Sequence, residues 1–515
     1  MANRYPTLGS TFAARNEPWS NSIRLLVGSF MSFKIFKMET LAEQHPSENF
    51  RVLPLFVILT LLVYIIVVHP LFLGPYSHIP GPKLGKISWY YIAWYDFWLQ
   101  RNDKIAKWHQ KYGSIICFRP GEISFASPEL MREIYGTAGK YTKSDLFENF
   151  MVYGQKPLFS IGSYWEHRKK RMLISSFYHN TNITRPVMEK WLRKNIHKLM
   201  ANIDKKIGQT RGNSDGTMVK GMIDAYPLFN CFAFDNITHV LFGSKYGAKT
   251  IENDCPEPLA WIASKMMHIL PANVAYRLLP ETLRLCLKSE DEMAEWNWRS
   301  LHAALADLDS VEDYTLLRRM LACRTKDGNT LTTSYIAAEL YDNINAAQET
   351  VAVGLIYLIF HLQGKNVRQE RYIEDPKKYY GGFRLPLRTR VTASTIALHH
   401  DPQVFPDPEE FCPERWLHQT AEKLRQMEKS FIPFGYGARI CLGKAFGIME
   451  LKMLAAFLLL RYEIETTPEM GDGKTGPMWQ CGSIEAVPIG LKGEIVFTRL
   501  HSMSSRSSTK YMERD

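Results

Sequence analysis

A short stretch near the C-terminus, FGYGARICLG at residues 434–443, combines one cysteine, one arginine and three glycines. Gly435 and Gly437 permit backbone conformations that are closed to other residues, and they let a flat molecule approach the main chain. The apolar, helix-forming residues after Cys441 put this thiol just before a helix N-terminus, where the helix dipole favours a thiolate. Arg439 adds a positive charge two residues away. Together these residue types suit a metal held in a planar ring that carries carboxylates.

The remaining cysteines give no competing metal or disulfide pattern. The chain has eight cysteines, none of them in a C-x-x-C pair, and their spacing is irregular. This spacing argues against a disulfide framework or a zinc ribbon and is typical of a reducing compartment. The alternative for Cys441 is a buried, inert cysteine in a turn.

The stretch resembles the heme-binding signature of the cytochrome P450 family, F-G-x-G-x-R-x-C-x-G, with every fixed position present. The resemblance implies that Cys441 is the proximal ligand of the iron of heme b. It also implies that the rest of the signature forms the loop around this cofactor: Phe434, Gly435, Arg439 and Gly443.

Two further helical segments extend the resemblance. HRKKRMLISSFY, residues 167–178, is similar to the C helix of fungal members, and this implies that His167 and Arg171 approach the heme propionates. AAQET, residues 346–350, resembles the acid–threonine motif of the distal I helix. There Thr350 would supply a hydroxyl on the oxygen-binding side, and Glu349 would help to relay protons. Without the family resemblance, each segment has a simpler interpretation. HRKKR alone would be a solvated basic face, and Glu349 alone would be a surface charge.

One element of the family is missing. FPDPEEFCPERWL, residues 405–417, resembles the meander region, whose arginine corresponds to Arg415. The family places an E-x-x-R helix, the K helix, between the I helix and the strands before the meander, but residues 351–404 contain no E-x-x-R. We expect either a mispredicted intron or a true deletion, and we predict that the chain as written binds heme poorly.

The elements that must position these residues are mainly helical. Residues 332–362 and 449–461 read as long helices, and short strands are expected in 115–127 and 384–398. The predicted fold class is therefore mainly α with small β-sheets, in the cytochrome P450 fold that the resemblance implies. The 515 residues carry a net charge of +11 and 46% hydrophobic residues, and no nucleic-acid motif or repeat is present. The basic charge therefore favours an anionic membrane or an acidic partner over nucleic acid.

The N-terminal region predicts a membrane anchor. Residues 52–76 contain no Lys, Arg, Asp or Glu, and a bilayer core requires roughly 20 apolar residues in a helix. We expect 1–51 to be either a flexible extension or a gene-model artefact. A transmembrane helix at 52–74, a catalytic domain at 75–500 and a disordered tail at 501–515 should follow. HIPGPKLG, residues 78–85, would form a stiff elbow where the chain leaves the membrane.

The resemblance implies a monooxygenase that inserts one oxygen atom of O2 into an apolar small molecule, with electrons from NADPH delivered by a membrane-bound cytochrome reductase. It further implies a single-pass protein of the endoplasmic reticulum whose catalytic domain faces the cytosol, acting in fungal secondary metabolism. Two alternatives remain open: a heme-thiolate isomerase, dehydratase or peroxygenase of the same fold, and a heme-poor, non-catalytic remnant of a monooxygenase.

Overall fold

The computed structural model describes residues 49–209, 220–253, 281–325, 327–360, 370–471, 476–482, 486–490 and 492–500. Most of the predicted N-terminal extension and the whole predicted tail at 501–515 lie outside these residues. The chain separates into two units, Met1–Leu73 and Gly74–Asp515.

In the first unit, helix α2 (Asn49–Val63) continues as a π-type helix, η1 (Tyr64–Leu73). Pro70 lies inside η1 and cannot donate a backbone N–H, which disturbs regular α-helical hydrogen bonding. The segment Pro54–Leu73 is long and apolar enough to cross a bilayer, judged by length and composition. It falls within the predicted 52–74.

The second unit is mainly helical, as predicted. Its helices are α3 (Lys83–Ile87), α4 (Trp89–Phe97), α5 (Arg101–Tyr112), α6 (Pro128–Tyr135), α7 (Tyr164–Ile174), α8 (Asn180–Ile183), α9 (Pro186–Gln209), α10 (Ala225–Phe242), α13 (Glu281–Ala306), α14 (Leu316–Ala322), α15 (Thr333–Phe360), α16 (Thr395–His399), α17 (Ala421–Ser430) and α18 (Lys444–Arg461). Single 3-10 turns include η2 (Asp145–Phe150), η3 (Leu158–Ser160), η7 (Pro413–Trp416) and η8 (Gly437–Arg439).

Local sequence explains the ends of these helices. The Ser127 hydroxyl accepts a hydrogen bond from the backbone N–H of Leu130 and caps α6, with Pro128 at the first helical position. Helix α5 ends at Tyr112. The next residue, Gly113, has a φ of 100°, a conformation that glycine adopts readily and other residues rarely do.

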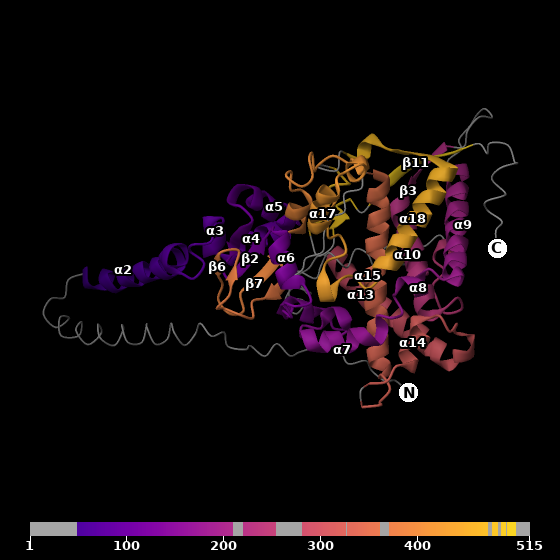
Figure 1. The fold of residues 1–515 in the computed structure, drawn as a ribbon, viewed down its shortest axis with the longest axis horizontal. Helices are drawn as coiled ribbons and strands as arrows, with labels where there is room; N and C mark the ends of the chain where they lie inside the picture. The colour runs from indigo at the N-terminus through magenta and orange to yellow at the C-terminus, as the bar shows by residue number, and fades with distance from the viewer. Residues whose placement is uncertain are drawn as a thin grey trace. The chain divides into compact units, whose positions relative to one another are not determined.

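The core forms around α15, which runs through the centre of the unit beside α10 and α18 (Figure 1). Helices α15 and α18 can pack closely because each has a glycine where the two helices cross. A Cβ on Gly354 of α15 would lie 3.0 Å from Leu451 of α18, and a Cβ on Gly447 of α18 would lie 3.9 Å from Val351 of α15. The two helices therefore touch just after residue 350.

The strands form small sheets. The largest has the order β1 (Ile115–Arg119), β2 (Glu122–Phe125), β7 (Arg390–Ala393) and β4 (Glu370–Tyr372). The β2–β7 pair is parallel and the other two pairs are antiparallel. The other sheets are β3 (Lys220–Asp224) with β11 (Glu494–Arg499) and β8 (Tyr462–Thr466), β9 (Gln480–Gly482) with β10 (Ala486–Pro488), and β5 (Tyr379–Tyr380) with β6 (Phe383–Arg384).

The passage from α15 to β4 is short. Helix α15 ends at Phe360, and the next described residue, Glu370, already belongs to β4. Between these points lie nine residues, HLQGKNVRQ, which contain no glutamate. The described residues from 370 to 404 form β4 to β7 and the short α16, so this part of the chain supplies no E-x-x-R helix.

Candidate functional site

The loop that carries Cys441 is fixed by its own backbone. The N–H of Cys441 donates to the carbonyl of Phe434 at 2.9 Å, which closes the loop. Gly435 and Gly437 have φ of 73° and 71°, the left-handed region that favours glycine. A Cβ on Gly437 would lie 2.0 Å from the carbonyl oxygen of Tyr135. At Gly437 the loop therefore lies directly against the end of α6.

Cys441 differs from the other described cysteines. Its residue is solvent-accessible, whereas Cys117, Cys231 and Cys323 are buried and Cys412 is half-buried. Burial nevertheless raises the pKa of the Cys441 thiol, and the backbone N–H groups of Gly443 and Lys444 lower it. Cys441 is therefore the one exposed cysteine among the described residues. The two N–H groups lie at the start of α18, as the sequence predicts.

Arg439 fastens this loop to a distant part of the chain. Its Nη1 donates to the carbonyl of Ile161 at 2.7 Å, and its Nη2 donates to the carbonyl of Gly162 at 2.5 Å. We expected Arg439 to act beside the sulfur. The cations that lower the Cys441 pKa are instead Arg171 and Lys444.

Five basic side chains gather beside this anchor, and we call them the cationic cluster: Lys143, His167, Arg171, Arg371 and Arg439. Burial, Arg439 and Lys143 lower the pKa of His167 to about 2. Burial, Arg371 and Arg171 lower the pKa of Arg439 to about 9.

Three members of the cationic cluster lack an ion-pair partner within the described part of the chain, although Asp342 lies close enough to Lys143 to raise its pKa. There, Lys143, Arg171 and Arg439 form no ion pair with an Asp or Glu. Gathering cations away from water is costly unless anions pair with them. A ligand with two carboxylates would satisfy this cluster.

Two members of the cluster were not predicted. Lys143 precedes η2, and Arg371 lies on β4; the two residues form an isolated antiparallel bridge. They are far apart in sequence and neither lies in a recognised motif, so no local signal marks them. Pairing of β4 with β7 brings Arg371 to the site.

Helix α15 presents Thr350 but turns Glu349 away. Ala346 and Thr350 are exposed although α15 is the central helix. The Thr350 hydroxyl donates to the carbonyl of Ala346 at 2.7 Å. Glu349 is buried and accepts a hydrogen bond from Tyr226 of α10 at 3.3 Å. Since Ala346 and Thr350 are four residues apart, they share one face of the helix, and Glu349 does not lie on it.

Two acidic residues, Glu339 and Asp342, lie on α15 before Ala346. Burial raises the pKa of both Glu339 and Asp342. Asp342 raises that of Glu339 further, whereas Lys143 lowers that of Asp342. Glu339 accepts hydrogen bonds from the N–H of Leu158 at 2.6 Å and from the Tyr335 hydroxyl at 2.8 Å. Asp342, which lies on the Ala346–Thr350 face, is therefore the member of this pair that ionises more readily.

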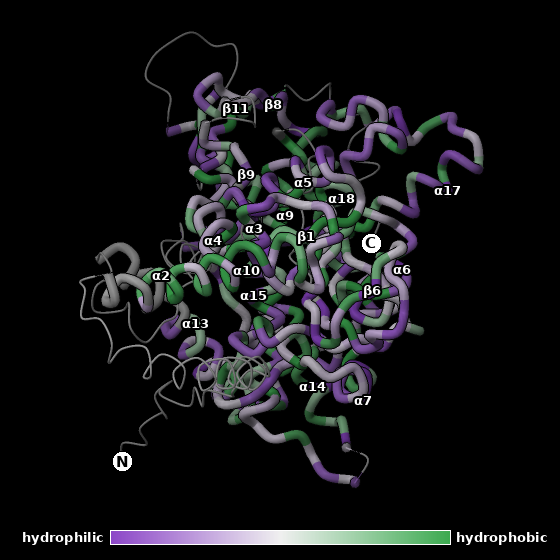
Figure 2. The backbone as a smooth tube through the Cα atoms, turned by 90° about the vertical axis from the view of Figure 1, so that its left-hand side faces the viewer, coloured by the Kyte–Doolittle hydropathy of each residue, from purple (hydrophilic) through white to green (hydrophobic). Residues whose placement is uncertain are grey.

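The meander is bonded mainly to itself. The Arg415 guanidinium donates to the backbone carbonyls of four nearby residues, namely Pro406, Asp407, Glu410 and Cys412. Among the described residues it meets no carboxylate. Val404, Phe405 and Met427 form a small separate core beside Trp416. Helix α17 stands out from the body in Figure 2.

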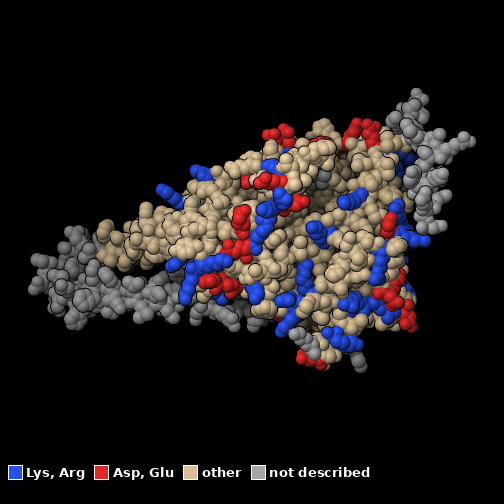
Figure 3. All heavy atoms as spheres, in the orientation of Figure 1, with Lys and Arg blue, Asp and Glu red and all other residues tan. Residues whose placement is uncertain are grey.

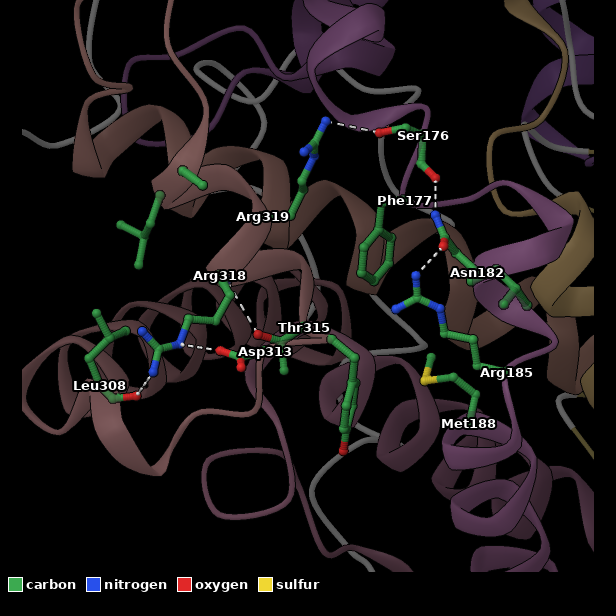
Figure 4. Close-up of a pocket in the computed structure, with 14 residues that line it drawn as sticks. Ser176, Phe177, Asn182, Arg185, Met188, Leu308, Asp313, Thr315, Arg318 and Arg319 are labelled. Atoms are coloured by element: carbon green, nitrogen blue, oxygen red, sulfur yellow. Dashed lines mark hydrogen bonds and ion pairs between the residues drawn. The ribbon is translucent and has the colours of Figure 1, made fainter.

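A surface pocket of about 610 Å³ lies elsewhere, between the ends of α7 and α8 and the start of α14 (Figure 4). None of the predicted site residues lines it. Its arginines are held by neighbours: Arg318 donates to the carbonyl of Leu308, and Arg319 donates to the hydroxyl of Ser176. We assign this pocket no role in the chemistry at Cys441.

The residues around Cys441 fit an iron macrocycle that bears two carboxylates. An accessible thiol supplies a ligand for iron. The cationic cluster supplies the opposite charge for the carboxylates. Cys441, with the loop 434–443, would hold the metal, and Lys143, His167, Arg171, Arg371 and Arg439 would hold the acidic edge.

Comparison with known proteins gives a consistent result. A family model described as "Cytochrome P450" matches residues 79–378 and 365–482. The two matches overlap at 365–378, a range that includes β4.

Among the relatives is the cytochrome P450 monooxygenase FGM1 of Gibberella zeae, 30% identical over 501 residues, which covers 86% of this chain and 96% of the relative. The tryptophan 6-hydroxylase fscE of Fusarium equiseti is 24% identical, covering 77% of this chain and 87% of the relative. The N-acetyltryptophan 6-hydroxylase ivoC of Emericella nidulans is 25% identical, covering 81% and 91%.

Proposed function

The chain belongs to the cytochrome P450 family, and we propose that Cys441 is the axial thiolate of its heme and that the protein inserts one oxygen atom into an apolar small molecule. Members of this family are oxidoreductases that use heme b, with electrons from NAD(P)H delivered by a reductase. The observation that carries the proposal is the accessible Cys441 thiol near Lys143, Arg171 and Arg439, three cations that form no ion pair among the described residues. When bound, heme with a thiolate ligand activates molecular oxygen.

The protein residues have separate tasks. The loop 434–443 presents the Cys441 sulfur, and the N–H groups at the start of α18 favour its thiolate form. The cationic cluster binds and orients the acidic edge of the cofactor. Thr350 holds a hydroxyl on the accessible face of α15, where it can order a proton-delivering water. Glu349 lies on a different side of α15, where it accepts a hydrogen bond from Tyr226. A proton relay through Glu349 would therefore have to pass along that side of the helix.

The basic helix α7 divides between two tasks. His167 and Arg171 turn inward to the cationic cluster, whereas Arg168 and Lys169 are exposed. Lys444, at the start of α18, is exposed as well. We propose that Arg168, Lys169 and Lys444 attract the acidic face of a cytochrome reductase, since complementary charges accelerate association.

We further propose that Pro54–Leu73 anchors the protein in the endoplasmic reticulum membrane with the catalytic unit in the cytosol, where the reductase acts. Relatives named as hydroxylases of tryptophan and N-acetyltryptophan support an aromatic substrate in fungal secondary metabolism. Added protease should digest the catalytic unit in intact microsomes. Protection of this unit would reverse the topology.

One observation favours a second candidate, a heme-poor remnant without activity. Arg415 finds no carboxylate among the described residues, and residues 351–404, which precede the meander, contain no E-x-x-R. A heme-thiolate isomerase or dehydratase is separated from a monooxygenase by its independence of NADPH and reductase.

The ligand assignment is tested by the Cys441→Ser variant. A serine hydroxyl cannot replace the thiolate, so the strongly red-shifted band of the reduced carbon monoxide complex should disappear. Retention of this band at the intensity of the unchanged chain would contradict the assignment. Thr350→Ala should leave heme content intact and divert electrons to peroxide; unchanged coupling of NADPH use to product would remove Thr350 from oxygen activation.

A further inference from the structure

The carboxylate of Asp342 lies on the same face of α15 as the Thr350 hydroxyl. Asp342, Ala346 and Thr350 follow one another at intervals of four residues, so they line one face of this helix. Asp342 is half-buried, whereas Ala346 and Thr350 are exposed. Eight residues of helix place Asp342 about 12 Å from Thr350 along the helix axis. A small molecule bound with one end beside Thr350 can therefore reach Asp342 with its other end.

Asp342 forms no ion pair among the described residues. Burial raises the pKa of its carboxyl group, while Lys143 and the N–H of Phe159 lower it. Lys143 is nevertheless bonded elsewhere, because its Nζ donates to the carbonyl of Phe159 at 2.5 Å. A half-buried carboxylate without a cation of its own gains stability when it binds one.

The neighbouring acid, Glu339, is satisfied by the protein itself. It is fully buried, and it accepts hydrogen bonds from the N–H of Leu158 at 2.6 Å and from the Tyr335 hydroxyl at 2.8 Å. Asp342 is more accessible and receives no hydrogen bond from a side chain of the described residues. Of the two acids on this part of α15, Asp342 is thus the one that can take up a cation from outside.

Three phenylalanine rings lie beside Asp342, and we call them the phenylalanine cluster: Phe147, Phe150 and Phe159. The ring centre of Phe159 lies 5.3 Å from that of Phe147 and 5.2 Å from that of Phe150. The Lys143 ammonium lies 4.0 Å from the centre of the Phe147 ring and 4.3 Å from that of Phe159. These contacts show that the rings present their faces to a cation. A carboxylate and aromatic faces are the two groups that recognise an amine.

The outer surface of the protein does not itself attract cations. The net charge is +11, and Lys and Arg side chains are spread over the face shown in Figure 3, where Asp and Glu gather in a few groups. Long-range attraction therefore favours anionic molecules. Recognition of a cation has to come from a local carboxylate, and Asp342 supplies one on the accessible face of α15.

We propose that Asp342 is a specificity-determining residue that selects a substrate with a positively charged amine, whose ammonium group pairs with this carboxylate beside the phenylalanine cluster. The inference rests on the proposed function and deepens it, because it names the class of substrate. The spacing of Asp342 and Thr350 would hold the amine at one end of the molecule and leave the other end beside the Thr350 hydroxyl.

Equilibrium dialysis of the full chain with tryptamine and with 3-propylindole tests this proposal. The two compounds share the indole ring and the length of the side chain, but only tryptamine carries an ammonium group. We expect the unchanged chain to bind tryptamine roughly tenfold more tightly. Asp342→Asn should remove this preference by weakening tryptamine binding alone. A chain that shows no preference for tryptamine, or that binds neither compound, would overturn the proposal.

Two further variants separate amine binding from a structural role. Glu339→Gln is the matched control on the same helix and should keep the preference for tryptamine. Phe159→Leu retains an apolar side chain but removes a ring face, so it should weaken tryptamine binding several-fold more than 3-propylindole binding. If Asp342 serves only as a counter-ion for Lys143, Asp342→Asn would weaken both compounds equally and change the circular dichroism spectrum. That result, or loss of the preference only in Glu339→Gln, would overturn the assignment.

The inference and the proposed function fail separately. The carbon monoxide band and its loss in Cys441→Ser test the heme ligand without reference to amines. If that band is present but tryptamine is not preferred, only the role of Asp342 is overturned. If tryptamine is preferred but the band is absent, the protein binds amines without oxidising them, and the proposed function is overturned.

Discussion

Two loops before the last long helix, the Cys441 loop and the meander, are held in opposite ways. Each carries an arginine whose guanidinium is bonded to backbone carbonyls. Arg439 reaches carbonyls of residues 161 and 162, which are 278 and 277 positions away in the chain. Arg415 reaches carbonyls only three to nine positions away. The first arginine joins two parts of the protein, whereas the second joins the meander to itself.

The contrast shows what the missing helix would have supplied. Bonds within one loop shape the loop, but they do not fix its position against the body. The meander has a small core of its own, and Phe411, Leu417 and Phe431 remain exposed around it. A helix with a glutamate facing Arg415 would give both an ion pair and an apolar surface at this place. The Cys441 loop is thus bonded to a distant part of the chain, whereas the hydrogen bonds of Arg415 stay within the meander.

The largest expected loss of stability is that of Arg439→Ala, compared with Arg415→Ala. Arg439→Ala removes two hydrogen bonds from a charged donor, worth about 3 kcal/mol or more of unfolding free energy, and relief among the neighbouring cations offsets only part of this. Arg415→Ala should cost about 1 kcal/mol or less, because the meander is already loosely attached. Urea unfolding of both variants measures the difference. Equal losses would remove the distinction between the two loops.

The second prediction concerns the contact of the Cys441 loop with α6. Gly437→Ala combines positive-φ strain of about 1–3 kcal/mol with a clash against the carbonyl of Tyr135. Gly154→Ala is the matched control, since its φ is 69° and no atom lies within 4 Å of a new Cβ. Gly437→Ala should therefore destabilise more than Gly154→Ala and lower heme content. Similar stability and heme content in both variants would show that the close contact is unimportant.

A smaller, pH-dependent effect is expected on α18, the helix that follows the Cys441 loop. Burial raises the pKa of Glu450 from 4.5 to about 8, while a hydrogen bond from Asn236 lowers it. Because the folded-state pKa lies above the unfolded one, the associated stability is complete below pH 4.5 and is lost as the pH rises to about 8.

At pH 4.5 the Glu450→Gln variant should therefore have the same free energy of unfolding as the unchanged chain. At pH 8.5 it should be more stable than the unchanged chain by about 1–3 kcal/mol. Thermal unfolding at the two pH values gives the difference. A Gln variant with no relative gain at the higher pH would mean that Glu450 is not held protonated by the fold.

The smallest expected effect on stability comes from Arg171. In protein prepared without heme, Arg171→Met should change the free energy of unfolding by less than about 0.5 kcal/mol, because burial of this cation is uncompensated. The same variant should lose heme faster. Arg168→Met is the control on the same helix, because its side chain is exposed, and it should change neither property. A large loss of stability without altered heme release would assign Arg171 a structural role.

The parts of the site that could be predicted lie in continuous segments. The Cys441 loop was singled out from its own residues, whereas the expectations for α15 and for His167 and Arg171 of α7 came from short motifs that resemble those of the family. Lys143 and Arg371 could not be predicted, since strand pairing joins residues that are remote in sequence. The direction of Glu349 was not evident either, because one residue along a helix turns a side chain by about 100°. The absence of the K helix could be predicted because residues 351–404 contain no E-x-x-R and the segment between α15 and the meander is short.

The most direct measurement is heme per polypeptide in the full chain as written and in a form with an E-x-x-R segment of a relative inserted between residues 360 and 370. Breaking a buried charge network costs about 3–5 kcal/mol, and total stability is about 5–15 kcal/mol. We predict low heme content in the chain as written and near-stoichiometric heme in the restored form. Equal, near-stoichiometric heme in both forms would contradict the account, because the meander would then be supported without the missing helix.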